Sequence, residues 1–193
     1  MAGVDVPAYV GRYLTEAHAV LDAIDRGGIQ NLIATCRALR SAGGRVFFLG
    51  VGGSAANASH AVNDFRKIAG IEAYAPTDNV SELTARTNDD SWADTFAPWL
   101  RTSRLSAQDA IFVLSVGGGS KTTSTNIVAA VDLAKSVGAK VLGIVGRDGG
   151  YTYRYGDAVV RIPPQSDDTI TPLAEAFQGV VWHLVATALA QES

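Results

Sequence analysis

Residues 45–54 read Arg45-Val46-Phe47-Phe48-Leu49-Gly50-Val51-Gly52-Gly53-Ser54, an apolar run that leads directly into a glycine-rich turn. A second apolar run, residues 110–114, leads into Ser115-Val116-Gly117-Gly118-Gly119-Ser120. Where a strand, a glycine turn and a helix follow one another, free backbone N–H groups and the positive end of the helix dipole face an anion. Two such units in one chain predict an α/β domain whose loops bind a phosphorylated small molecule.

Apolar runs alternate with amphipathic patterns along the rest of the chain. Helices are expected at about 6–26, 28–42, 54–68, 79–86, 91–100, 124–137 and 172–190, and strands at 45–49, 71–75, 110–114, 140–145 and 157–162. Strands that read as continuous apolar runs between helices are typical of a parallel sheet covered on both faces. We therefore predict a three-layer α/β/α domain with a five-stranded, mainly parallel sheet, spanning residues 1–193 as a single domain. Residues 1–43 form a helical N-terminal extension, which we expect at an oligomer interface.

Composition excludes several classes of partner. The 193 residues carry a formal net charge of −3, so there is no basic excess to hold a nucleic-acid backbone. No run of lysine or arginine suits an anionic membrane surface, and no apolar stretch is expected to span a bilayer. The single cysteine, Cys36, excludes an intramolecular disulfide and is expected in the core. The first residues lack the basic start and apolar run of a signal peptide, so we expect a cytoplasmic protein without nucleic-acid or membrane partners.

The two glycine loops allow more than one interpretation. Residues 50–55 match the dinucleotide-binding pattern G-x-G-x-x-A, but that scheme needs an acidic residue at the end of the second strand, and Glu72 begins it. The second loop is rich in hydroxyl groups and contains Lys121, all favourable for a phosphate dianion. The alternatives are a turn that needs glycine only for its shape and a flexible surface loop. The phosphate interpretation explains both loops together.

Four titratable residues fall at helical spacings. His60 and Asp64 are four apart on one predicted helix, and Glu175 and His183 are eight apart on the last. If the two helices face each other, these side chains could form a cluster of nitrogen and oxygen ligands suited to zinc or a related divalent ion. The same groups could instead perform acid–base chemistry. The alternative is that each is an ordinary solvated or hydrogen-bonded side chain.

The motifs together resemble those of a known family. Residues 49–60 look like the G-N-G-G-S-x-x-x-A-x-H signature of the phosphoheptose (sedoheptulose 7-phosphate) isomerases, which belong to the sugar isomerase, or SIS, domain group. Asn88-Asp89 is similar to that family's substrate-contact pair, although the same two residues are also typical of a helix cap or an Asx turn. Leu114-Ser115 with residues 124–127 resembles its phosphate loop, and residues 145–150 resemble its T-G-x-D-G-G turn. The similarity covers nearly the whole chain.

This resemblance implies roles for individual residues. It implies a homotetrameric aldose–ketose isomerase of sedoheptulose 7-phosphate or a related phosphorylated sugar, which moves a proton through an enediol. Asp64 would be the base that moves the carbon-bound proton, and His183 would serve the oxygen proton. The implied ligands of a divalent metal ion, zinc in that family, are His60, Asp64, Glu175 and His183. The implied substrate-binding residues are Gly52, Gly53, Ser54, Asn88, Asp89, Ser115, Ser120, Ser124 and Glu175.

The chain also departs from the family pattern. Asp64 stands where the family has a glutamate, Glu175 where it has a glutamine, and Val51 where it has an asparagine. The phosphate loop is longer by about four residues, so Lys121 becomes a candidate phosphate contact. Two other functions remain open: a non-catalytic adaptor that binds a replication-initiator protein, as one relative in this branch does, and a sugar-phosphate sensor without turnover. The four retained titratable side chains favour the enzyme, because an adaptor has no need of them.

Overall fold

The computed structural model describes residues 4–191, which fold around one parallel sheet. The strands are β1 (Val46–Leu49), β2 (Ala73–Tyr74), β3 (Ala110–Ser115), β4 (Lys140–Val145) and β5 (Ala158–Arg161). Their order is β2-β1-β3-β4-β5, and each neighbouring pair is parallel. The predicted five-stranded parallel sheet is confirmed. Its strand order reverses between β1 and β3, the place where open α/β sheets bind ligands.

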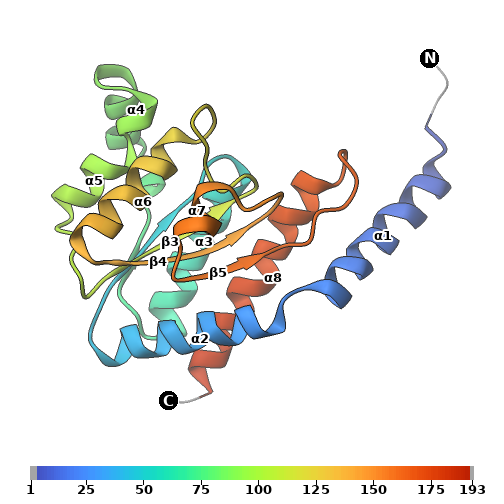
Figure 1. Ribbon diagram of the computed structural model, residues 1–193, viewed down its shortest axis with the longest axis horizontal. Helices are drawn as coiled ribbons and strands as arrows, with labels where there is room; N and C mark the ends of the chain where they lie inside the picture. The colour runs from blue at the N-terminus through green and yellow to red at the C-terminus, as the bar shows by residue number, and fades with distance from the viewer. Residues whose placement is uncertain (1–3, 192–193) are drawn as a thin grey trace.

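Helices cover both faces of this sheet, as Figure 1 shows. They are α1 (Val6–Ala23), α2 (Arg26–Ser41), α3 (Gly53–Lys67), α4 (Val80–Asp89), α5 (Phe96–Thr102), α6 (Thr125–Val137), α7 (Gly150–Tyr155) and α8 (Ile170–Ala190), with short 3₁₀ turns η1 (Pro76–Asp78) and η2 (Trp92–Asp94). Successive strand side chains point to opposite faces. Phe48 and Phe112 pack with α2, α3 and α8, whereas Phe47 and Ile111 pack with α5 and α6. The predicted three layers are confirmed, and α7 is a helix that the sequence pattern does not predict.

Helix α8 corrects one expectation. By length and composition it could cross a membrane, contrary to the prediction that no stretch could. Half of its apolar window is buried inside the protein, however, and Leu173, Trp182 and Leu189 belong to the core. The apolar character of α8 therefore follows from its packing against the sheet, α2 and α3, since the core helix of a globular domain passes the same test.

The single cysteine lies in the core, as predicted. Cys36 is fully buried on α2, and burial raises the pKa of its thiol to about 12. A thiol in that state carries almost no thiolate near neutral pH and is chemically inert.

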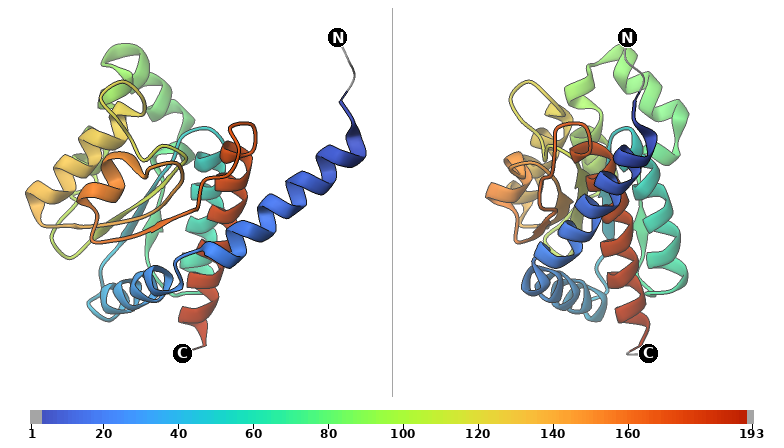
Figure 2. Two further views of the ribbon diagram at one scale, coloured as in Figure 1. Left: turned by 45° about the vertical axis from the view of Figure 1, so that its right-hand side comes forward. Right: turned by 90° about the vertical axis from the view of Figure 1, so that its right-hand side faces the viewer.

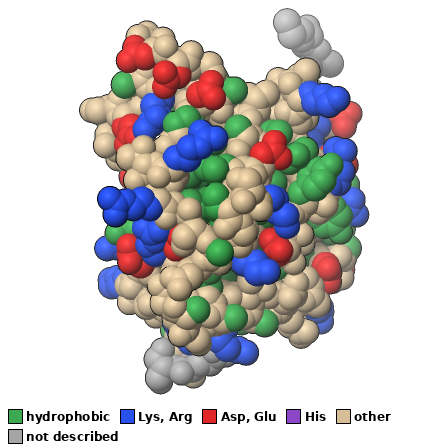
Figure 3. All heavy atoms as spheres, turned by 60° about the vertical axis from the view of Figure 1, so that its left-hand side comes forward, with side chains coloured by type: hydrophobic (Ala, Val, Ile, Leu, Met, Phe, Trp, Pro, Cys, Tyr) green, Lys and Arg blue, Asp and Glu red, His purple; other side chains and the backbone are tan. Residues whose placement is uncertain are grey.

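Surface charge is mixed on the face drawn in Figure 3. Among the described residues seen there, lysine and arginine side chains alternate with carboxylates and form no continuous basic surface. This distribution gives that face no electrostatic preference for a nucleic-acid backbone.

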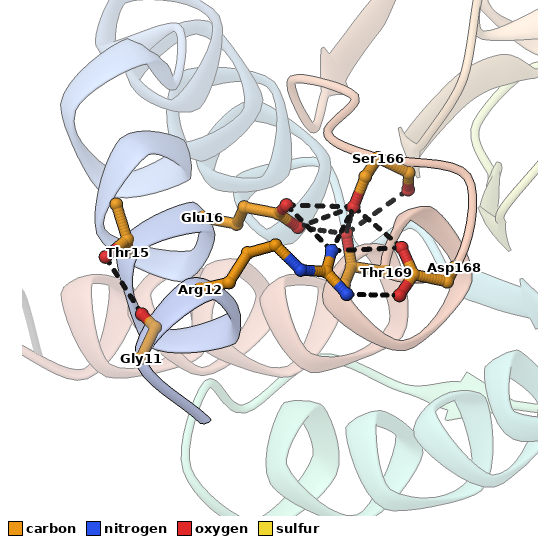
Figure 4. A network of polar contacts seen from close by, with 7 residues as sticks. All are labelled: Gly11, Arg12, Thr15, Glu16, Ser166, Asp168 and Thr169. Carbon is orange, nitrogen blue, oxygen red and sulfur yellow. Dashed lines mark hydrogen bonds and ion pairs between the residues drawn. The ribbon is translucent and has the colours of Figure 1, made fainter. Parts of the chain in front are cut away.

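Helix α1 projects from the body of the molecule, as Figures 1 and 2 show. A polar network connects it to the segment before α8 (Figure 4): Arg12 donates to Asp168, with Nη2 and Oδ2 2.5 Å apart, and Glu16 accepts hydrogen bonds from Ser166 and Thr169. These bonds hold the pKa of Asp168 at about 2 and lower the pKa of Glu16, the latter chiefly through the Thr169 hydroxyl.

The network predicts that α1 detaches in acid. A carboxylate whose pKa is lowered on folding stabilises the folded arrangement above its unfolded pKa, about 3.9 for aspartate, and the stabilisation is lost as pH falls toward the folded value. Amide hydrogen exchange in α1, corrected for intrinsic rates, should therefore accelerate between pH 5 and pH 2. Arg12→Gln should already show fast exchange in α1 at pH 5. Equal protection of α1 in wild type and Arg12→Gln at pH 5 would show that the network does not hold the helix.

Candidate functional site

A cavity of about 520 Å³ opens at the carboxyl ends of the central strands. The four serines expected to bind phosphate come together there, although they arise from two separate segments, the start of α3 and residues 115–124. They are Ser54, Ser115, Ser120 and Ser124. The cavity is also lined by Val51, Val116, Gly117, Gly119 and Thr123 of the two predicted glycine loops, and by Arg147, Asp148 and Thr171.

Ser54 is the most informative of the four serines. It lies in the first turn of α3 and is only 1% exposed. Among the described residues its Oγ has no hydrogen-bond partner. A buried hydroxyl without a partner is costly, so a ligand oxygen is the natural partner for this one. Ser115 offers a second donor, because its Oγ accepts from the Gly118 N–H at 3.0 Å and its own O–H remains available.

The glycine loop after β3 is held in place by the turn after β4. Thr152 donates both its backbone N–H and its hydroxyl to the Gly118 carbonyl, at 2.9 and 2.8 Å. Gly118 has φ +66°, and a Cβ there would lie 1.9 Å from the carbonyl oxygen of Gly149. Only glycine allows this approach, which holds the loop against the turn after β4.

The inserted residues of the loop form a closed turn. The Ser120 Oγ accepts from the backbone N–H groups of Thr122 and Thr123, and the Ser120 N–H donates to the Thr123 carbonyl. Lys121, the predicted candidate for a phosphate contact, is not among the residues that line the cavity. The cation that does line it is Arg147.

A second cluster lies further along α3, against α8. Ligand atoms of His60, Asp64 and His183 all lie within 4.8 Å of one another. The His183 Nε2 is 3.7 Å from Asp64 Oδ2, while Asp64 Oδ1 accepts from the Asn63 amide at 2.8 Å. Asp64 is 8% exposed, whereas both histidines are open to solvent. The predicted convergence of α3 and α8 at these residues is therefore present.

Hydrogen bonding sets the orientation of His183. Its Nδ1 lies 2.7 Å from the Gly179 carbonyl oxygen, which can only accept, so Nδ1 carries the proton. The lone pair of neutral His183 is then on Nε2 and faces Asp64. Trp182 stacks on His183 and contacts His60 edge to face, with ring centroids 3.5 and 4.8 Å apart. An imidazole oriented through one nitrogen in this way is prepared to bind a metal or a proton through the other.

Glu175 corrects the predicted four-ligand set. It is absent from the cluster, and its carboxylate lies beside Gly53, where a Cβ would be 2.4 Å from Oε2. Gly53 precedes His60 by seven residues on α3, which corresponds to about 10 Å along the helix axis. Glu175 therefore lies at the first turn of α3, next to the cavity that Ser54 lines. Two histidines and one carboxylate still form a donor set that suits zinc.

Asn88 and Asp89 lie outside both groups. They are exposed at the end of α4, where the Asn88 amide donates to the Asp89 carboxylate at 2.7 Å. Neither residue lines the cavity. Their predicted contact with sugar hydroxyls stays a prediction.

Helix α3 connects the cavity to the cluster. Ser54 lines the cavity, and His60 follows six residues later, about 9 Å along the helix axis. A ligand anchored by an anionic group at Ser54 could therefore extend along α3 and place another of its atoms at Asp64 and His183.

Comparisons with known proteins identify the family of the chain. A family model described as SIS domain matches residues 12–146. The phosphoheptose isomerase of Paramagnetospirillum magneticum is 32% identical over 155 residues, which are 77% of each chain. The lincomycin biosynthesis protein LmbN of Streptomyces lincolnensis is 32% identical over 159 residues, which are 76% of this chain and 56% of LmbN. The solved structure of a phosphoheptose isomerase from Francisella tularensis superposes with a TM-score of 0.82 over both whole chains, at 21% identity. The chain therefore belongs to the SIS domain family, and within it to the phosphoheptose isomerase branch.

Proposed function

We propose that the protein is an aldose–ketose isomerase of a phosphorylated sugar, with sedoheptulose 7-phosphate or a related sugar phosphate as substrate. The observation that carries the proposal is the arrangement along α3. A buried Ser54 hydroxyl, without a hydrogen-bond partner among the described residues, lies at one end; along the helix axis His60 follows after about 9 Å and Asp64, which His183 faces, after about 15 Å. The relatives named phosphoheptose isomerase support the same reaction.

The cavity would bind the phosphate of the substrate. Ser54 and Ser115 have hydroxyl protons that no described residue accepts, and Ser124 precedes the first turn of α6. Donors of this kind, with the N-terminus of α3 beside them, stabilise a phosphate dianion. The anchored phosphate directs the carbon chain along α3 toward Asp64.

Asp64 and His183 would move the protons. The Asp64 carboxylate takes the proton from one sugar carbon and returns it to the neighbouring carbon, while His183 Nε2 exchanges a proton with the substrate oxygen. The hydrogen bond from Asn63 holds one carboxylate oxygen and leaves Oδ2 free to act. Because His183 donates through Nδ1 to Gly179, its Nε2 is available as the acceptor.

As an alternative to this acid–base role, His60, Asp64 and His183 would hold a divalent ion, most suitably zinc, since a His183 Nε2 that binds an ion cannot exchange a proton. A bound ion would supply Lewis-acid polarisation of the substrate carbonyl. The departures from the family pattern lie around these groups, with the shorter Asp64 in the cluster and Val51 on the cavity wall. They mark the places where a different sugar phosphate could be accommodated.

Formation of an isomeric sugar phosphate tests this function. Pentose, hexose and heptose phosphates should be supplied separately with the protein as purified and after chelation, and the products separated by ion-exchange chromatography. Conversion of one phosphorylated sugar, with no conversion of the same sugar without its phosphate, is expected. Failure to convert any sugar phosphate, with or without added zinc, would instead support a sensor or an adaptor.

We propose further that the protein is a homo-oligomer, most simply a tetramer, with α1 at its interface. Among the described residues of α1 only Val20 is buried, and Leu14 is 64% exposed on a helix that projects from the body. Val180 and Leu184 are also exposed on α8, beside His183. Exposed aliphatic side chains on neighbouring helices are typical of a surface that another subunit covers.

Replacing Leu14 with aspartate should lower the native mass. Burying a leucine contributes about 1.5–3 kcal/mol, and a buried aspartate adds a desolvation cost. Light scattering coupled to gel filtration should therefore show smaller species for Leu14→Asp. Val80→Asp is the matched control, because Val80 is similarly exposed, at 70%, but lies on α4. An unchanged mass for Leu14→Asp would exclude α1 from the interface.

A further inference from the structure

Arg147 lines the phosphate cavity from a position that the function above does not explain. We propose that its guanidinium binds the phosphate of the substrate directly and gives the cavity its selectivity for phosphomonoesters. The inference rests on the proposed sugar-phosphate function. Three features of the structure support it: the placement of the turn, its backbone conformation and the charges in the cavity.

The turn that carries Arg147 is fixed against the phosphate loop. The Gly146 N–H donates to the Ser115 carbonyl at 3.1 Å, and the Gly149 N–H closes the turn on the Gly146 carbonyl at 2.9 Å. Because Gly146 precedes Arg147, its hydrogen bond to Ser115 fixes Arg147 close to the end of β3. Ser115, the last residue of β3, and Arg147, in the turn after the neighbouring strand β4, line the same cavity.

The backbone of Arg147 is in a conformation that favours glycine. Its φ is +49°, and only two other described residues besides glycine, Arg104 and Ser124, have positive φ. Such residues are uncommon, and they concentrate at functional sites, where the surrounding structure enforces them. Ser124 lines the same cavity, so two of the three lie at this site. An arginine therefore stands at this place in the cavity although glycine would fit the backbone more easily, which supports a use for its side chain there.

The charges in the cavity indicate what the Arg147 side chain does there. Asp148 also lines it, with Oδ1 accepting from the Gly150 N–H at 3.2 Å, so the wall carries a negative charge that would repel a phosphate. Arg147 is the cation among the lining residues. Arg12, Arg45 and Arg86 each pair with a carboxylate, whereas no described residue forms a hydrogen bond or ion pair with the Arg147 guanidinium. An unpaired arginine that offsets Asp148 turns the cavity into an anion site.

Arginine suits this role better than lysine would. Its planar guanidinium can donate two parallel hydrogen bonds to two phosphate oxygens and remains charged at all working pH values. The hydroxyls of Ser54 and Ser115 would meet other oxygens of the same group. The selectivity for phosphomonoesters therefore comes from the charged Arg147 contact, which is added to the neutral hydroxyl donors of the serines.

Binding of inorganic phosphate to Arg147→Gly tests the proposal. Glycine suits the positive φ, so the variant should fold with an undiminished melting temperature. By titration calorimetry at constant ionic strength, its phosphate affinity should fall about tenfold or more, because charge-assisted hydrogen bonds are lost. Arg147→Lys should lie between the variant and wild type.

Arg104→Gly is the matched control, since Arg104 also has positive φ, +55°, but does not line the cavity. It should bind phosphate like wild type. Phosphate affinity of Arg147→Gly within twofold of wild type would overturn the proposal, even if the protein isomerises a sugar phosphate. Conversely, if wild type binds phosphate but converts no sugar, and Arg147→Gly loses the binding, the role of Arg147 stands while the isomerase function fails.

Discussion

Asp64→Asn should abolish turnover while the fold and phosphate binding persist. The amide has the shape of the carboxylate but cannot accept a proton from carbon, and general-base catalysis contributes about 10²–10⁴ in rate. The expected result is a fall of kcat by at least about 100-fold in a sugar-phosphate isomerisation assay. Phosphate affinity should remain unchanged, because Ser54, Ser115 and Arg147 line a cavity to which Asp64 does not contribute.

Asp22→Asn provides the matched control for this variant. Asp22 lies four residues after His18 on α1, with 3.6 Å between Oδ2 and His18 Nε2, so the pair resembles Asp64 and His60 in spacing but is exposed. Its rate should equal that of wild type. A near-normal rate for Asp64→Asn would remove Asp64 from the proton-transfer step, while unchanged phosphate binding would still support the cavity.

The second large effect is expected at Trp182, which supports the cluster. Trp182 is fully buried, packs between α3 and α8, and places its ring against both His60 and His183. Its indole N–H points to the Asn57 Oδ1 at 3.5 Å, and the Asn57 amide in turn donates to the Glu175 carbonyl at 3.0 Å. Trp182→Ala leaves a cavity where the two helices meet and should lower the free energy of unfolding by about 3–5 kcal/mol.

Urea unfolding followed by circular dichroism measures this difference. Trp92→Ala is the control, because Trp92 is 39% exposed and has a more distant aromatic neighbour, Phe96, at 6.4 Å between centroids. It should cost less than about 1 kcal/mol. Trp182→Phe keeps most of the packing and should recover part of the lost stability. Equal losses for the two alanine variants would mean that Trp182 does not hold α3 against α8.

The sheet could be predicted because its strands are buried on both faces. Phe112 and Val141 belong to continuous apolar runs, and such runs between helices have few other structural solutions. Helix α7 could not be predicted, because Gly149 and Gly150 at its start and exposed tyrosines along it give no apolar periodicity. It forms because the Gly118 and Gly119 carbonyls accept hydrogen bonds from its backbone, a tertiary contact that no local pattern encodes.

The candidate site, like the fold, could be predicted in part from the sequence. Serines that follow parallel strands meet at one edge of the sheet, so the convergence of Ser54 and Ser115 follows from the strand assignment. Arg147 follows β4, and its place in the cavity depends on β4 lying beside β3, which the chain order alone does not give. The one sequence signal for Arg147 was that an arginine follows shortly after the apolar run of residues 140–145.

Glu175 shows where helical spacing becomes insufficient. A separation of eight residues places Glu175 and His183 on one face of α8, but it does not decide which turn of α3 each side chain meets. The packing of α8 on α3 brings His183 to Asp64 and Glu175 to Gly53. The three-residue cluster and the separate carboxylate are thus a consequence of tertiary packing.

Solvent deuterium incorporation tests the central claim most directly, that one site anchors a sugar phosphate and moves a proton between adjacent carbons. The protein would be incubated in deuterated water with each sugar phosphate, and carbons 1 and 2 followed by NMR, with Asp64→Asn in parallel. Deuterium entering carbon 1 or carbon 2 of one sugar phosphate with wild type, and not with Asp64→Asn, is the predicted result. No deuterium at either carbon of any sugar phosphate tested, with or without added zinc, would contradict the account.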